Sequence, residues 1–116
     1  MAVVWTKLSD CNDHAFYAGT VFRFAATEPY EPVVDYMLML DGSVAQAGLK
    51  FVVTTGYKAG AVNILCTFPQ EAYVAGALAI RAEWLSQNWR EWVYPDTDPK
   101  QIFVLENYPA PDSLPE

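Results

Sequence analysis

The stretch that decides the fold is Glu83 to Pro95, which reads Glu-Trp-Leu-Ser-Gln-Asn-Trp-Arg-Glu-Trp-Val-Tyr-Pro and holds three of the four tryptophans. On a helix, at about 100° per residue, its apolar side chains fall on one half of the circumference and its polar ones on the other. The spacing predicts an amphipathic helix from about Arg81 to Val93, which Pro95 prevents from continuing.

The bulky face of this helix predicts where the core lies. A buried tryptophan removes about 150–250 Å² from water, more than any other side chain. We therefore expect a sheet to pack against this face. The residues predicted to form the structural core are Trp84, Leu85, Asn88, Trp89 and Trp92. Asn88 is the one amide on this face, and we expect it to bond to buried backbone, for example at the end of a strand, because an unpaired buried amide is costly.

Runs of β-branched and aromatic residues predict the sheet. In the run from Thr20 to Ala25, alternation places Phe22 and Phe24 opposite Arg23. Residues 49–55 and 61–68 flank a glycine-bounded turn and should pair antiparallel. Further strands are predicted at 35–41 and 101–106, and residues 3–8 form a short strand or an ordered arm. The expected fold class is α+β, a curved antiparallel sheet of about five strands with the C-terminal Trp-rich helix on its concave face.

Length and composition predict a single domain over residues 1–108, followed by a Pro-rich C-terminal tail over 109–116. No apolar run approaches the roughly 20 residues that span a bilayer, so no membrane association is expected. The N-terminal residues lack the basic and apolar segments of a secretory signal, which favours a cytoplasmic protein.

The net charge of −7 restricts the class of partner. Phosphate backbones repel such a surface, so we expect no nucleic-acid binding, whereas a basic protein would be attracted. The simpler interpretation is that the charge only keeps an apolar small domain soluble. Acidic loops steer association, and the predicted interface residues are Glu28, Glu31, Asp96 and Asp98.

Only residues 10–14, Asp-Cys-Asn-Asp-His, gather a thiol, an imidazole and carboxylates. Catalytic partners usually converge from separate elements, and a metal site would want further ligands. A polar turn is therefore the favoured interpretation, with no catalytic residue, metal or cofactor expected. Cys66 lies in a strand-like run and is interpreted as a small buried side chain rather than a disulfide partner of Cys11.

Three strings of residues resemble a family of small bacterial immunity proteins, the immunity protein 45 family. They are Thr-Thr-Gly-Tyr-Lys-Ala-Gly-Ala-Val-Asn (54–63), Phe-Pro-Gln-Glu-Ala (68–72) and the tryptophan-rich stretch 83–95. The resemblance covers about residues 49–108, while residues 1–48 fit only in general pattern. It implies a cytoplasmic α+β protein that binds and blocks a cognate toxin of a polymorphic toxin system, with delivery by a type VI or contact-dependent system. The tryptophans of the motif are interpreted as fold-defining rather than as toxin contacts.

Two other classes of function remain open from the residues. One is a small-molecule-binding module or minor enzyme with a pocket near Cys11 and His14. The other is an oligomeric structural protein, which would expose a large apolar patch. A deep, polar pocket open to solvent favours the first of these, whereas a dry core favours an immunity protein.

Overall fold

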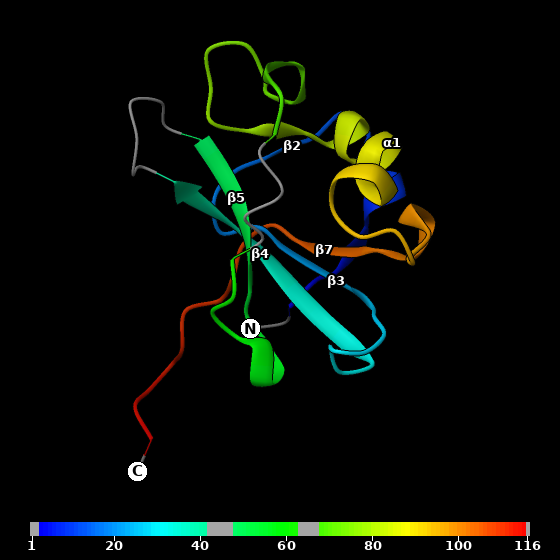
Figure 1. Ribbon diagram of the computed structural model, residues 1–116. Coiled ribbons are helices and arrows are strands. Elements are labelled where there is room, and N and C mark those ends of the chain that lie inside the picture. The colour runs from blue at the N-terminus through cyan, green and yellow to red at the C-terminus, as the bar shows by residue number, and fades with distance from the viewer. Residues whose placement is uncertain (1–2, 42–47, 63–67, 116) are drawn as a thin grey trace.

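The computed structural model describes residues 3–41, 48–62 and 68–115 as one sheet with a helix on one face (Figure 1). The sheet has five strands: β1 (Thr6–Lys7), β3 (Val21–Ala25), β4 (Val33–Asp41), β5 (Gly48–Val53) and β7 (Phe103–Leu105). Their order is β1-β7-β3-β4-β5, and every pair is antiparallel. The α+β fold with one C-terminal tryptophan-bearing helix is thus confirmed.

Two short strands, β2 (Ala15–Phe16) and β6 (Ile80–Arg81), pair antiparallel in a separate small sheet. This pair holds the start of the only α-helix in the described part of the chain, α1 (Ala82–Trp92). No side chain caps the helix, and the Ala82 N–H instead donates to the His14 carbonyl at 3.0 Å. The register of β2 with β6 therefore fixes where α1 begins, one residue from the predicted Arg81.

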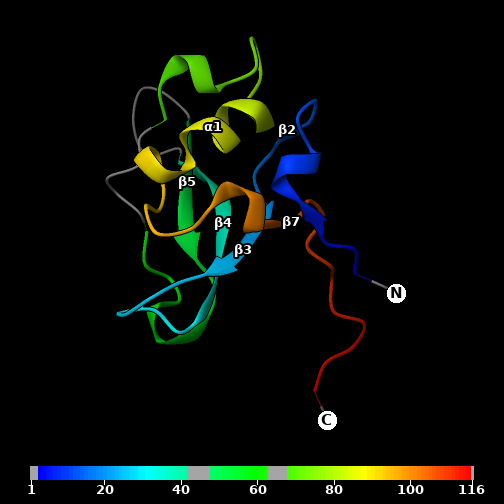
Figure 2. The ribbon, with the colours of Figure 1, turned by 90° about the vertical axis from the view of Figure 1, so that its right-hand side faces the viewer.

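Helix α1 packs on the face of the sheet that looks toward the viewer in Figure 2. Trp89 is fully buried, and its ring lies 5.3–5.9 Å from the rings of Phe22 and Phe24 on β3 and of Phe51 on β5. Trp84 and Leu85 are also buried, while Asn88 and Trp92 are half-buried at the edge of the contact. The prediction that this tryptophan face meets a sheet is confirmed.

The bonding of Asn88 differs from the expectation. Its side-chain amide donates to the Trp84 carbonyl at 2.8 Å, within the same helix, and not to a strand. Because the residue is half-buried at the edge of the packed face, a partner one turn back is enough to satisfy it.

Strand alternation holds where it was predicted, with Phe22 and Phe24 buried and Arg23 exposed. Strand β4 begins two residues before the predicted Asp35, because Val33 and Val34 pair with the end of β3. Of the predicted strand 61–68, Val62 forms an antiparallel bridge to Val52. Residues 63–67, including Cys66, lie outside the described residues.

Residues 109–115 are exposed, and they leave the sheet on the side opposite α1 (Figure 1).

Candidate functional site

The structure brings the two predicted acidic loops together at one end of β3. One loop joins β3 to β4, and the other joins α1 to the short helix η4 (Pro99–Gln101). The Thr27 N–H donates to the Tyr94 hydroxyl at 2.9 Å, and the Thr97 hydroxyl donates to the Ala25 carbonyl at 2.6 Å. We call this region the acidic end, defined by Glu28, Glu31, Asp96 and Asp98.

The four carboxylates of the acidic end are not equivalent. Glu28 and Asp96 are exposed. Asp98 is half-buried and accepts the Lys100 N–H at 2.9 Å, which caps η4. Glu31 is half-buried and accepts the Tyr57 N–H at 3.2 Å, so it holds the turn at η2 (Gly56–Lys58). Two of the four predicted interface residues are therefore held within the chain, which leaves Glu28 and Asp96 as its free charges.

The side of the sheet away from α1 is a surface for which the sequence gave no functional signal. We call it the outer face, defined by the strand residues whose side chains alternate away from the helix. Cross-strand pairing aligns Val21 with Met37 and Leu105, and Met37 with Val52. The apolar members of the outer face are Val21, Ala25, Val33, Met37, Met39, Val52, Phe103 and Leu105.

Two ion pairs cross the outer face between neighbouring strands. Arg23 donates to both oxygens of Asp35, at 2.8 and 2.9 Å, and its guanidinium lies 4.2 Å from the centre of the Trp5 ring. The hydrogen bond to Asp35 raises the pKa of Arg23 further. Lys50 pairs with Asp41 at 2.9 Å. Because the bidentate Arg23–Asp35 pair lies under the Trp5 ring, this contact fixes the N-terminal arm, which carries Trp5, on the sheet.

Alternation in the sequence placed Arg23 outward but did not reveal its partner. The pairing with Asp35 depends on the register of β3 against β4, which the intervening acidic loop sets. A charged residue at the outward position of each of two neighbouring strands was the available signal.

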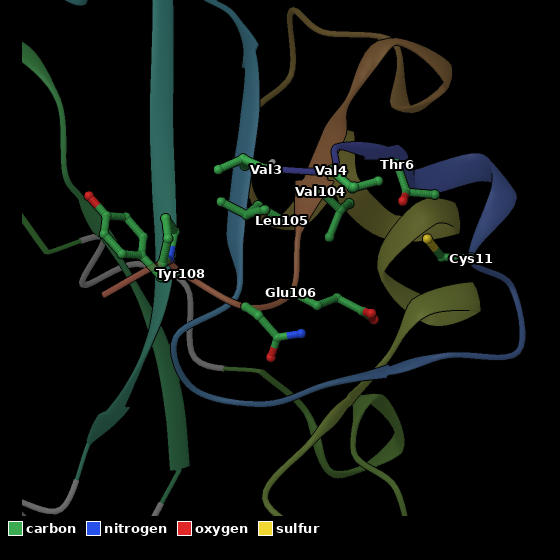
Figure 3. Close-up of a pocket in the computed structure, with 10 residues that line it drawn as sticks. Val3, Val4, Thr6, Cys11, Val104, Leu105, Glu106 and Tyr108 are labelled. Carbon is green, nitrogen blue, oxygen red and sulfur yellow. The ribbon is translucent and has the colours of Figure 1, made fainter. Parts of the chain in front are cut away.

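A cavity of about 420 Å³ lies where β1 and β7 separate beyond their last pair, Thr6 with Val104. Figure 3 shows Cys11 and Thr6 at one end of it and Tyr108 at the other. The N-terminal arm contributes Val3 and Val4, both exposed. The lining is mainly apolar, and His14 is not part of it.

Cys11 and His14 have separate partners. The Cys11 thiol is buried and donates to the Lys7 carbonyl at 3.3 Å, and burial together with nearby carboxylates raises its pKa. His14 Nδ1 lies 2.9 Å from Glu106, and this hydrogen bond raises the pKa of His14. The thiol is thus kept protonated and is not bonded to the imidazole, which is the opposite of an activated nucleophile.

Within residues 3–41, 48–62 and 68–115, no three histidine, cysteine or carboxylate side chains gather in a way that would hold a metal ion. No helix in these same ranges is long and apolar enough to cross a membrane.

Comparison with known proteins matches the chain to a family model. The family model Immunity protein 45 matches residues 8–104, which extends the resemblance from the C-terminal half to nearly the whole sheet. No curated protein and no solved structure matches the chain. The match covers β3, β4, β5, α1 and part of β7, so it includes both the core and the acidic end. The chain therefore belongs to the Immunity protein 45 family, and this membership implies toxin neutralisation as its general function.

Proposed function

We propose that this protein binds the toxin domain encoded beside it and blocks that domain by occupying its surface, without catalysis. The observation that carries the proposal is the family match over residues 8–104. The state of Cys11 and His14 supports the absence of catalysis, because the thiol is protonated and the imidazole is bonded to Glu106. The proposed site of action is the cytoplasm, with the toxin delivered by a type VI or contact-dependent system.

The charge distribution supports a basic partner. With a net charge of −7, the protein attracts a positively charged surface from a distance and accelerates its approach. Glu28 and Asp96 are the free carboxylates of the acidic end, so we propose that they steer the toxin. Glu31 and Asp98 then act at the same end by holding the two loops in shape.

A small-molecule-binding module or minor enzyme has less support. The cavity beside Cys11 has a volume in the range of ligand sites. Its described lining, however, combines exposed residues such as Val3, Val4 and Tyr108 with the buried apolar Val104 and Leu105, and not with convergent buried polar groups.

Co-expression provides the test. The toxin domain from the neighbouring reading frame is produced in cells with this protein or with an empty vector, and growth and co-purification are measured. We expect growth to be restored and the two chains to purify together. Toxicity that persists in the presence of well-expressed, folded protein, with no complex recovered, would contradict the proposal.

A further inference from the structure

The outer face is more apolar than a sheet face that meets water. Antiparallel sheets that pack a core on one side usually place polar side chains on the other. Here the outward positions of β4 are Val33, Asp35, Met37, Met39 and Asp41, and Phe103 stands outward on β7. Val33 is 53% exposed and Phe103 is 40% exposed, although both lie in regular strands. Val21 and Leu105 are already buried within the chain, so the exposed apolar part of the outer face is made by Val33, Phe103 and the half-buried Met37, Met39 and Val52. Exposed apolar surface of this kind marks an interaction site.

The charges on the outer face do not oppose its burial. Removing one member of a buried ion pair is costly, whereas a pair that is already complete carries no unpaired charge into an interface. Arg23 is bonded to Asp35 through two hydrogen bonds, and Lys50 is paired with Asp41. Arginine, tryptophan and tyrosine are also the residues that most often dominate binding energy. Arg23 and Trp5 meet at the centre of this face.

The size of the face shows what else an interface here would need. A strand residue covers about 16 Å² of sheet, so the strands of this sheet span at most roughly 400 Å², and Val21, Asp35 and Leu105 are already buried within that area. A stable interface buries about 800 Å² on each partner, so the flanking loops must supply the rest. The loop that carries Glu28 borders the outer face directly, because Val33 follows it. Tyr57 stands beside this loop, 68% exposed, with its hydroxyl bonded to the Pro29 carbonyl.

We infer that the outer face seats the cognate toxin domain, and that the toxin presents an apolar patch bordered by basic side chains. This rests on the proposed function. A second copy of this chain is disfavoured as the occupant, because two chains of net charge −7 repel each other. A basic partner with an apolar patch complements both parts of the surface, the exposed Val33 and Phe103 and the acidic border at Glu28.

Two residues of β4 give a matched pair of variants. Val33 and Leu40 are 53% and 57% exposed, but their side chains lie on opposite faces of the strand. Val33→Lys adds a charge to the outer face, and Leu40→Lys adds the same charge to the other face. Phe103→Ala removes an outer-face aromatic ring without adding charge. Thermal unfolding first establishes that all three variants fold, and their affinity for an inactivated toxin domain from the neighbouring reading frame is then measured.

The inference predicts that Val33→Lys and Phe103→Ala each weaken binding about tenfold or more, while Leu40→Lys binds like the wild type. Equal affinity for Val33→Lys and wild type would overturn the inference and leave the proposed function standing. A wild-type dimer that Val33→Lys dissociates would also overturn it, because the occupant would be a second copy. Failure of the wild-type protein itself to bind would overturn both the proposed function and the inference.

Discussion

Trp89 is the residue on which the core depends most. Its ring is fully buried between three phenylalanines, so its packing joins α1 to two strands, β3 and β5. Its indole N–H has no hydrogen-bond partner in the described part of the chain. Trp89 therefore contributes through apolar burial and ring packing rather than through a polar contact.

Replacing Trp89 by alanine should lower the free energy of unfolding by about 3–5 kcal/mol, because it removes the largest side chain from a packed core. Trp92→Ala is the matched control on the same helix, and its effect should be clearly smaller because Trp92 is half-buried. Urea denaturation of both variants measures the difference. Equal losses would mean that the helix packs differently from the arrangement described.

Gly56 is required at its position for two reasons that can be separated. Its φ is +68°, which a side chain rarely adopts, and a Cβ there would overlap the Glu31 carboxylate. Gly60, in the same turn, has φ +93° but open space around it. Both alanine variants should lose about 1–2 kcal/mol from strain.

Gly56→Ala should therefore lower the melting temperature more than Gly60→Ala. Combining Gly56→Ala with Glu31→Ala should bring its effect close to that of Gly60→Ala, because the overlapping carboxylate is gone. A double-mutant cycle measures this coupling. If the two glycine variants behave alike in the wild-type background, Glu31 does not hold the turn.

At the scale of elements, the pair of His14 with Glu106 joins the loop after the short helix η1 (Leu8–Asp10) to the end of β7. The hydrogen bond to Glu106 raises the pKa of His14 in the folded protein, and the charges of Glu106 and Asp13 add to this effect. A raised folded pKa means that protonation stabilises the fold. The stabilisation is fully present below the ordinary pKa of histidine and is lost as the pH rises through the raised value.

His14→Gln should therefore be less stable than the wild type at about pH 5.5 and equally stable at about pH 8.5. The difference should stay below about 1 kcal/mol, because both side chains are 42% exposed and solvent screens the pair. His14 is the only histidine, so its NMR titration can be followed directly. In Glu106→Gln the pKa of His14 should fall toward its ordinary value, and an unchanged titration would exclude the pairing.

The elements that the sequence predicts well are those with local signals. The face of α1 and the alternation of Phe22, Arg23 and Phe24 follow from residue spacing alone. The pairing of β2 with β6 and the insertion of β7 between β1 and β3 bring together residues more than 60 positions apart. Nothing in either short strand specifies its partner, so these contacts depend on the whole core.

At the scale of the whole molecule, the site likewise combines features that the local sequence predicts with contacts that only the complete fold brings together. Acidic residues in two Pro-containing loops are visible in the sequence, but their meeting at one end of β3 depends on Tyr94 and Thr97. That Asp98 caps η4 was foreseeable, since Asp-Pro-Lys is typical of a helix start. The hydrogen bond from the Tyr57 N–H to Glu31 was not foreseeable, because 26 positions separate the two residues.

Reversing the two free charges of the acidic end, in Glu28→Lys with Asp96→Lys, should slow association with the toxin domain. The dependence of the association rate on salt should also weaken, while the dissociation rate changes little. Glu71→Lys is the control, because it is an exposed carboxylate on a different short helix, η3 (Gln70–Ala72). Stopped-flow kinetics measures these rates. The double variant changes twice as much charge as the control, so an effect of Glu71→Lys on the logarithm of the association rate that is about half that of the double variant would mean that only net charge matters.

The most direct test of neutralisation by binding is a titration of the toxin's activity with the purified protein. We predict that activity falls linearly and reaches zero at one equivalent, and that it returns when the immunity protein is denatured and removed. Inactivation at far below one equivalent, or activity that does not return, would contradict a non-catalytic block.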